Sequence, residues 1–317
     1  MGASAVQVML LALVLALAID VWLGEPSWRF HPVVWMGNYL SFFESWVAQV
    51  TSAAGSDSAD YSSFGRGALI WLLGVSFVWA VFAALQGLFL QLPTVLSVLL
   101  IGLTLKPMLA WKMLRDEVLA VEVALGQSLE AGRTQLARLV SRDVTLLTEA
   151  QVRESAIETL AENLNDSVVA PLFWFVLLGL PGVALYRFAN TADAMWGYPD
   201  MYRGRYWQWA GKWAARADDV LSWVPARITA LLVVFVSGGL PLKQLFTEAC
   251  RTPSPNSGWP MAAMALALGV SLNKPDVYCL NAEGRAPQTS DTARSVVLAS
   301  KVCFAVVASA AMVGCFL

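Results

Sequence analysis

The chain has 317 residues, of which 57% are hydrophobic and 14% are charged. Ordinary soluble domains contain about 45–50% apolar and about 25% charged residues, so this composition excludes such a domain and predicts a protein of the lipid bilayer. The net charge of −2, without any run rich in Lys and Arg, excludes a nucleic-acid partner, because phosphate backbones are bound by clustered cations.

The first apolar run covers residues 5–19. It lacks a basic region and a small-residue cleavage site, so we expect a membrane helix and not a signal peptide. Further apolar runs follow at residues 67–90, 95–105, 168–185, 225–240, 261–270 and 295–317. Together they predict an all-α polytopic integral membrane protein, with helical cytoplasmic segments and a single domain over residues 1–317.

Two segments do not fit a simple series of crossings. Residues 261–270 would cover only about half of the hydrocarbon thickness at about 1.5 Å per residue, so this run is expected to be re-entrant or buried. Residues 51–63 are rich in Ser, Ala and Asp without periodicity, which predicts a flexible loop. The number of crossings is therefore left open.

Two long polar stretches, 106–166 and 187–227, carry thirteen of the 21 basic residues. The positive-inside rule predicts that both are cytoplasmic. In that case residues 168–185 cannot form a single crossing, and Gly179 and Pro181 favour a broken or re-entrant helix there. The alternative is that the two stretches lie on opposite sides of the membrane.

Residues 149–166 predict a helix in which four carboxylates recur every fourth residue: Glu154, Glu158, Glu162 and Asp166. This spacing places them on one helical face, where like charges repel unless cations neutralise them. Oxygen ligands of this kind suit Mg²⁺ and its phosphates. The spacing alone favours a solvated charged face, but it does not decide between the two, so both interpretations stay open.

A second acidic group contains Asp193, Asp218 and Asp219. Adjacent carboxylates beside an apolar run are costly unless they are paired or bound to metal. Arg216 and Arg227 could satisfy them in a structural ion-pair network, which is the alternative to a metal site. The chain has no P-loop, and its single histidine, His31, is at least as well explained by a structural hydrogen bond as by catalysis.

A series of irregular motifs resembles the adenosylcobinamide-phosphate synthase (CobD/CbiB) family, in family order from about residue 20 to 280. They are Gly24-Glu-Pro, His31-Pro, Ser141-Arg-Asp143, Glu158 to Asp166, Ala170 to Trp174, Tyr186 to Asp193, Gly197-Tyr198, Tyr202, Ala215 to Asp219, Trp223 to Arg227 and Ser254 to Pro260. Two departures are Glu25, where Asp is commoner, and Ser222, where Asn is usual.

The resemblance implies a membrane enzyme that uses ATP and Mg²⁺ to join aminopropanol phosphate, or a related amino alcohol, to a propionate of adenosylcobyric acid. It implies catalytic carboxylates at Glu158, Glu162, Asp166, Asp193, Asp218 and Asp219, with metal at Glu162, Asp166 and Asp219. It implies substrate or phosphate binding by Arg142, Asp143, Asn163, Asn190, Arg216, Arg227, Ser254 and Asn256.

The same resemblance implies a multi-pass protein of the bacterial cytoplasmic (inner) membrane, with its site on the cytoplasmic side and other cobalamin-assembly enzymes as possible partners. Two other functions stay open. One is a regulatory membrane sensor of the AmpE type, which is related in sequence, and the other is a transporter or scaffold in which acidic residues line a cation path.

Overall fold

A computed structural model describes residues 4–25, 29, 31–48, 50 and 60–316. The described chain is almost entirely helical, with α1 (Ala5–Leu23), α2 (Pro32–Val47), α3 (Tyr61–Phe89), α4 (Thr94–Leu105), the 3₁₀ turn η2 (Lys106–Met108), α5 (Trp111–Leu125), α6 (Leu129–Leu136), α7 (Glu149–Leu164), the π-helical turn η3 (Asn165–Val169), α8 (Ala170–Trp196), α9 (Lys212–Val236), α10 (Leu242–Ala249), α11 (Gly258–Leu268) and α12 (Thr289–Phe316).

Six helical segments of the described chain are long and apolar enough to cross a membrane. They are Ala5–Leu23, Tyr61–Phe89, Thr94–Leu125, Glu149–Trp196, Lys212–Val236 and Thr289–Ser309. Large apolar side chains cover their outer faces, as Phe77 on α3 and Phe235 on α9 show with exposures of 70% and 77%. Helices whose backbone polar groups are satisfied internally suit such a lipid-facing position. The prediction of an all-α polytopic membrane protein is confirmed.

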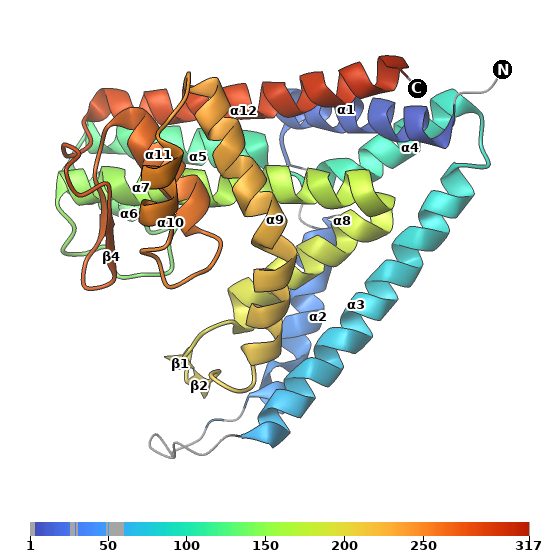
Figure 1. The fold of residues 1–317 in the computed structure, drawn as a ribbon. Helices are drawn as coiled ribbons and strands as arrows, with labels where there is room; N and C mark the ends of the chain where they lie inside the picture. The colour runs from blue at the N-terminus through green and yellow to red at the C-terminus, as the bar shows by residue number, and fades with distance from the viewer. Residues whose placement is uncertain (1–3, 26–28, 30, 49, 51–59, 317) are drawn as a thin grey trace.

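The helices form a layer and a group that descends from it (Figure 1). In the layer, α12, α1 and α4 lie along one edge, and α5, α7 and the first part of α8 form a second row beside them. The second part of α8 packs with α2 and α3 in the descending group, and α9 contacts both parts of the molecule. The layer and the descending group therefore meet where α7 passes into α8.

The helix α8 is broken in the middle. Gly179 has φ 70° and ψ −152°, a conformation that favours glycine, and Pro181 follows two residues later. The chain turns back at this point (Figure 1), and the Leu180 N–H donates to Gln86 Oε1 of α3 at 2.7 Å. The prediction of a broken helix within residues 168–185 is confirmed.

Other sequence-based expectations are confirmed in part. Residues 261–268 of the short apolar run lie in α11, which is largely buried, and residues 269 and 270 follow its end. Of the predicted flexible loop, residues 51–59 lie outside the described residues. Residues 61–63 are the first turn of α3, where the Asp60 side chain accepts the Ser63 N–H at 2.9 Å, so that end of the loop prediction is wrong.

Two small antiparallel hairpins were not predicted. The first pairs β1 (Met201–Tyr202) with β2 (Arg205–Tyr206), and the second pairs β3 (Leu272–Lys274) with β4 (Tyr278–Leu280). The strand β3 packs on α7, which also contacts α5, α6, α11 and α12. Because α7 is covered by all of these elements, every residue from 152 to 161 is buried.

Candidate functional site

The helix α7 begins at a capping box and ends at a change of helical pitch. The Thr148 side chain accepts the Gln151 N–H, and Gln151 Oε1 accepts the Thr148 N–H at 2.8 Å, which fixes the first turn. At Asn165 the chain enters a π-helical turn that ends at Val169. Single π turns inside helices are frequent at functional sites, because the extra residue redirects side chains and disturbs the local hydrogen bonding.

The carboxylates of α7 do not form a solvated face. Glu154 and Glu158 are only 6% and 5% exposed, while Glu162 and Asp166 are partly exposed. Burial of a charged carboxylate is costly unless a cation or hydrogen bonds compensate for it. The interpretation of this stripe as an ordinary solvated surface is therefore wrong.

Around the π turn, three helices bring carboxylates together. We call Glu162, Asp166, Asp193 and Asp218 the acidic centre. The negative charges of the three Asp side chains repel one another, and the charge of Glu162 is repelled by Asp166 and Asp193. The sequence-based expectation that these four act together is matched by their positions, while their catalytic role stays a prediction.

Polar neighbours hold the acidic centre in place. Asn190 Nδ2 donates to Asp218 Oδ1 at 3.3 Å, and the Tyr186 hydroxyl lies 3.4 Å from Asp166 Oδ1 and 3.1 Å from Ser222 Oγ. Ser222 therefore keeps a hydrogen-bonding group at the position where the family usually has Asn. These bonds orient the carboxylates, but they do not supply a positive charge.

Within the described residues, no three His, Cys, Asp or Glu side chains lie close enough to form a ready-made metal site. Mg²⁺ commonly uses only one or two protein carboxylates and completes its octahedron with water and phosphate oxygens. The donors of the acidic centre are all hard oxygens, so they fit Mg²⁺ that arrives with a nucleotide. The predicted ligand set of Glu162, Asp166 and Asp219 stays a prediction.

Asp219 lies at the rim of the acidic centre, where its charge acts on Asp193 and Asp218. Its main-chain oxygen accepts a hydrogen bond from Asn256 Nδ2 at 2.8 Å. The exposed Arg216 acts electrostatically on Asp219.

Arg227 belongs to a different cluster. It donates to Asn256 Oδ1 at 3.0 Å and to the Pro255 carbonyl oxygen at 3.1 Å, and it stacks on the rings of Trp223 and Trp259. Ser254 caps the same loop by accepting the N–H groups of Asn256 and Ser257. Arg227, Ser254 and Asn256 thus join α9 to α11, and the alternative in which Arg227 neutralises the acidic residues is not supported.

A polar pocket of about 190 Å³ lies beside α7, where Glu158 and Glu162 line it. We call it the Arg142 pocket, and its lining is Leu139, Val140, Ser141, Arg142, Glu158, Thr159, Glu162, Asn163, Lys274 and Tyr278. Arg142 Nη2 donates to Glu158 Oε2 at 3.1 Å and also bonds to Ser155 Oγ. The predicted residues Arg142, Glu158, Glu162 and Asn163 are therefore brought together.

Two residues of this pocket, Lys274 and Tyr278, were missed by sequence analysis because none of the quoted family-like motifs contains them. The only local signal was the Pro275-Asp276 turn between two short segments. Burial, followed by the charges of Glu158 and Glu162, raises the pKa of Tyr278 well above its usual value, so its hydroxyl remains a hydrogen-bond donor. The hairpin β3–β4 thus contributes one cation and one neutral donor to the pocket.

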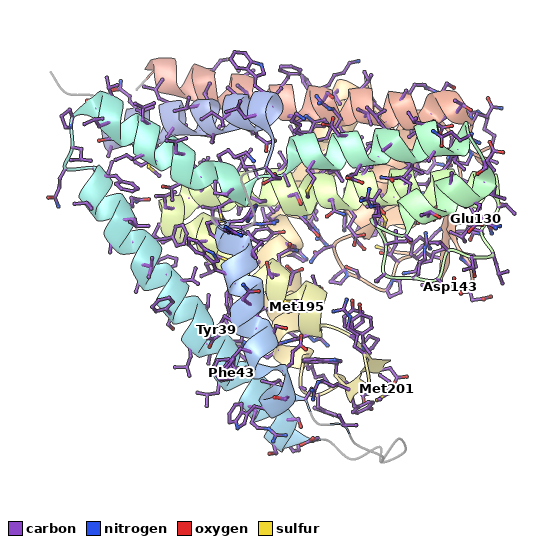
Figure 2. All side chains as sticks on the ribbon, turned by 180° about the vertical axis from the view of Figure 1, so that it is seen from behind. Tyr39, Phe43, Glu130, Asp143, Met195 and Met201 are labelled. Atoms are coloured by element: carbon purple, nitrogen blue, oxygen red, sulfur yellow. The ribbon has the colours of Figure 1, made fainter. Side chains whose placement is uncertain are left out.

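Asp143 is separate from this pocket. It is exposed, and the N–H and hydroxyl of Thr145 donate to its Oδ1 at 2.9 and 2.8 Å. These bonds hold the pKa of Asp143 below its usual range and shape a tight turn. In Figure 2, Asp143 and Met201 lie on the same side of the helical layer, where the loops before α7 and after α8 gather.

Another buried charged group joins the first residues of the chain to the polar stretches. Lys106 Nζ lies 3.1 Å from both Asp20 Oδ1 and Glu25 Oε2, and Glu25 Oε2 lies 3.0 Å from His31 Nε2. The charge of Glu25 also acts on Arg187 near the acidic centre. The expectation of a structural hydrogen bond for His31 is matched, while a catalytic role stays untested.

Comparisons with known proteins agree with the resemblance. A family model described as CobD/Cbib protein matches residues 13–303. The chain is 39% identical over 283 residues to the probable cobalamin biosynthesis protein CobD of Methanothermobacter thermautotrophicus, with 87% of each chain covered. It is 39% identical over 283 residues to the cobalamin biosynthesis protein CobD of Halalkalibacterium halodurans, with 84% of this chain and 82% of that relative covered. No solved structure matches the chain.

Proposed function

This chain belongs to the CobD/CbiB family, and from that premise we propose that it is an adenosylcobinamide-phosphate synthase of cobalamin biosynthesis. The reaction joins 1-amino-2-propanol phosphate, or a related amino alcohol, to the propionate carboxylate of adenosylcobyric acid and consumes ATP. The names of the relatives support the pathway. We place the site on the cytoplasmic side of the bacterial inner membrane, where ATP is available.

The observation that carries the proposal is that four carboxylates meet at the π turn, next to a pocket that contains two cations. Carboxylates suit a Mg²⁺-nucleotide, and Arg and Lys suit the phosphate groups of both proposed phosphorylated substrates. A reaction that uses two phosphorylated substrates and a metal requires both kinds of group at adjacent positions.

The chemistry requires activation because a carboxylate is a poor acyl donor. In the proposed route, the propionate oxygen takes the γ-phosphoryl group of ATP, which gives an acyl phosphate and ADP. The amine nitrogen then forms a bond to the acyl carbon, inorganic phosphate leaves with the C–O bond pair, and the nitrogen loses a proton. The products are the amide, ADP and phosphate.

The residues divide this work by charge. Asp166, together with one further carboxylate of the acidic centre, would hold Mg²⁺, which neutralises the phosphate oxygens when it is bound. Arg187, next to the Asp166 main chain, would stabilise negative charge as the phosphoryl group moves. Glu162 belongs to both the acidic centre and the Arg142 pocket, so it connects the metal-binding side to the side with the cations.

The direct test is an assay with purified protein in detergent, adenosylcobyric acid, 1-amino-2-propanol phosphate and Mg-ATP. We expect ADP release and a product whose mass corresponds to the two substrates minus one water. Omission of ATP or of either substrate should abolish the product. Product formation without ATP, or none with all components and folded protein, would contradict the proposal.

A genetic test asks the same question in cells. A strain that lacks this protein should grow on cobinamide or a later intermediate under conditions that require cobalamin, and cobyric acid should not replace it. Growth on cobyric acid alone would place the block before this step and contradict the synthase assignment.

A further inference from the structure

The size of the Arg142 pocket limits what it can hold. At about 190 Å³ it is smaller than the roughly 300–1,000 Å³ that is typical of pockets for drug-sized ligands. A nucleotide or a corrinoid is too large to be enclosed there. A compact polar molecule of a few carbon atoms is the kind of ligand that fits.

The charges of the pocket are mixed, which further restricts the ligand. Arg142 and Lys274 contribute two cations, and Glu158 and Glu162 contribute two carboxylates. Arg142 is paired with Glu158, but among the described residues Lys274 forms no ion pair and acts on Glu158 and Glu162 at longer range. A ligand with one anionic and one cationic end matches this arrangement better than a simple anion.

An incompletely satisfied acceptor lies in the same wall. The Glu158 side chain is only 6% exposed, and its Oε1 forms no hydrogen bond of normal geometry within the described residues, although Tyr278 helps to stabilise its charge. A buried acceptor without a donor costs about 1–3 kcal/mol, and more when it is charged. An ammonium group in the pocket would give Glu158 a charged donor in addition to the neutral Tyr278 hydroxyl.

We propose that the Arg142 pocket is the subsite for the small aminoalkyl phosphate, with the phosphate at Arg142 and Lys274 and the ammonium group at Glu158 and Glu162. This inference deepens the proposed function and rests on it. Lys274 and Tyr278 of the β3–β4 hairpin then determine which phosphorylated amine is accepted.

The position of the pocket along α7 supports this assignment. Glu158 and Glu162 are one turn apart, a rise of about 6 Å, and Asp166 follows one further turn along. An amine held at the first pair would lie within about two turns of the proposed Mg²⁺ ligands, where the acyl phosphate would form. The pocket thus lies on the same helical face as the acidic centre, close to the position where the acyl phosphate would form.

The first test measures binding without turnover. Purified protein in detergent is titrated calorimetrically with 1-amino-2-propanol phosphate, in the absence of ATP and corrinoid. Propyl phosphate lacks the amine, 1-amino-2-propanol lacks the phosphate, and inorganic phosphate lacks both carbon chain and amine. We expect each of these three to bind at least about tenfold more weakly than the complete ligand, which corresponds to about 1.4 kcal/mol.

The second test changes the hairpin. Lys274→Met should weaken the binding of 1-amino-2-propanol phosphate at least about tenfold, and Lys274→Arg should restore most of it, because a guanidinium also binds phosphate. Lys243→Met is the matched control: Lys243 is exposed on α10, outside the pocket, and its replacement should leave the affinity unchanged. In turnover, Lys274→Met should raise the KM for the amine substrate and leave the KM for ATP unchanged.

Failure of this inference differs from failure of the proposed function. The subsite assignment is contradicted if the complete ligand and propyl phosphate bind with equal affinity. It is also contradicted if folded Lys274→Met binds the complete ligand with wild-type affinity. Either result would hold even if amide formation were demonstrated. Competition between ATP and the aminoalkyl phosphate in the titration would reassign the pocket to the nucleotide. Specific binding without any ATP-dependent amide product would retain the pocket and overturn the synthase assignment.

Discussion

Arg187 Nη1 donates a hydrogen bond to the main-chain carbonyl oxygen of Asp166 at 3.0 Å. The bond joins the second polar stretch of the chain to the first, and it does so at the π turn, where the regular helical hydrogen-bond pattern is interrupted. A guanidinium is thereby fixed beside the acidic centre. The positions of the two polar stretches are consequently coupled, and a change in either should disturb the same site.

The first prediction concerns Glu162, which belongs to the acidic centre and also lines the Arg142 pocket. Glu162→Gln preserves the side-chain shape but removes the charge that would attract Mg²⁺ or the ammonium group. We expect turnover to fall about tenfold to a thousandfold, which corresponds to about 1.4–4 kcal/mol of lost transition-state stabilisation. The rate is measured at saturating and limiting Mg²⁺, together with the melting temperature.

Glu130→Gln provides the control, because the Glu130 side chain is 80% exposed on α6, where it forms an ion pair with Arg133 at 3.6 Å. It should retain wild-type turnover. Wild-type turnover in Glu162→Gln as well would remove Glu162 from the mechanism. A large loss of melting temperature in parallel with the rate would give Glu162 a role in the scaffold.

The second prediction concerns a close helix contact. A Cβ atom at Gly67 of α3 would lie 2.0 Å from the Ala210 carbonyl oxygen, so the backbone would have to move. We expect Gly67→Ala to destabilise the protein by about 1–3 kcal/mol, as overpacked cores do. At Gly65, on the same helix, a Cβ atom would enter open space with no neighbour within 4 Å, and Gly65→Ala should be neutral or stabilising by about 0.5–1 kcal/mol.

Intrinsic tryptophan fluorescence during thermal unfolding in detergent measures both variants. Equal melting temperatures for Gly67→Ala and Gly65→Ala would show that α3 does not pack against residue 210 as described. The comparison is direct because both substitutions add the same methyl group to one helix.

Local patterns predicted the helical segments well. The four-residue carboxylate spacing of α7 and the break at Gly179 depend on neighbouring residues, so both could be predicted from the sequence. The burial of Glu154 and Glu158 does not follow from local spacing, because it depends on α5, α11, α12 and β3, which pack around α7 from distant parts of the chain. This is why the spacing alone favoured a solvated face, which the structure contradicts.

Long-range pairs were the main omission for the same reason. Lys106 meets Asp20 across 86 residues, and Lys274 lines the same pocket as Glu158 from a hairpin that none of the family-like motifs contains. Neither pairing has a fixed spacing along the chain. The family resemblance identified Arg142, Glu162 and Asp166 as candidates, but only the fold separates their surroundings from the cluster around Arg227.

The third prediction concerns the buried pair of Lys106 and Asp20, whose side chains are 5% and 0% exposed. Lys106→Met leaves Asp20 without its cation inside the protein, and such a loss typically costs about 3–5 kcal/mol. We expect a clear fall in melting temperature. The double variant that combines Lys106→Met with Asp20→Asn should recover part of the lost melting temperature, because the uncompensated charge is gone.

Lys301→Met is the control for the loss of a lysine, since Lys301 is exposed on α12. It should melt like the wild type. A double variant that is less stable than Lys106→Met alone would show that the two residues do not compensate each other's charge.

The last prediction concerns topology. Both polar stretches should be cytoplasmic, because Arg187 and Asp166 join them at one site and the first carries seven of the chain's basic residues. We expect Arg138→Cys and Gln208→Cys, at exposed positions in the two stretches, to react with an impermeant maleimide only after the membrane is opened. The native cysteines are first replaced by serine or alanine.

Gln91→Cys provides the control from the opposite side. Tyr61, at the start of α3, packs on the Trp209 ring with centroids 5.8 Å apart, so this end of α3 lies with the second polar stretch. Gln91 follows the other end of this 29-residue helix, which is long enough to cross a membrane. It should therefore be labelled in cells whose inner membrane is intact. Labelling of Arg138→Cys or Gln208→Cys under those conditions would place part of the proposed site away from cytoplasmic ATP and contradict the arrangement.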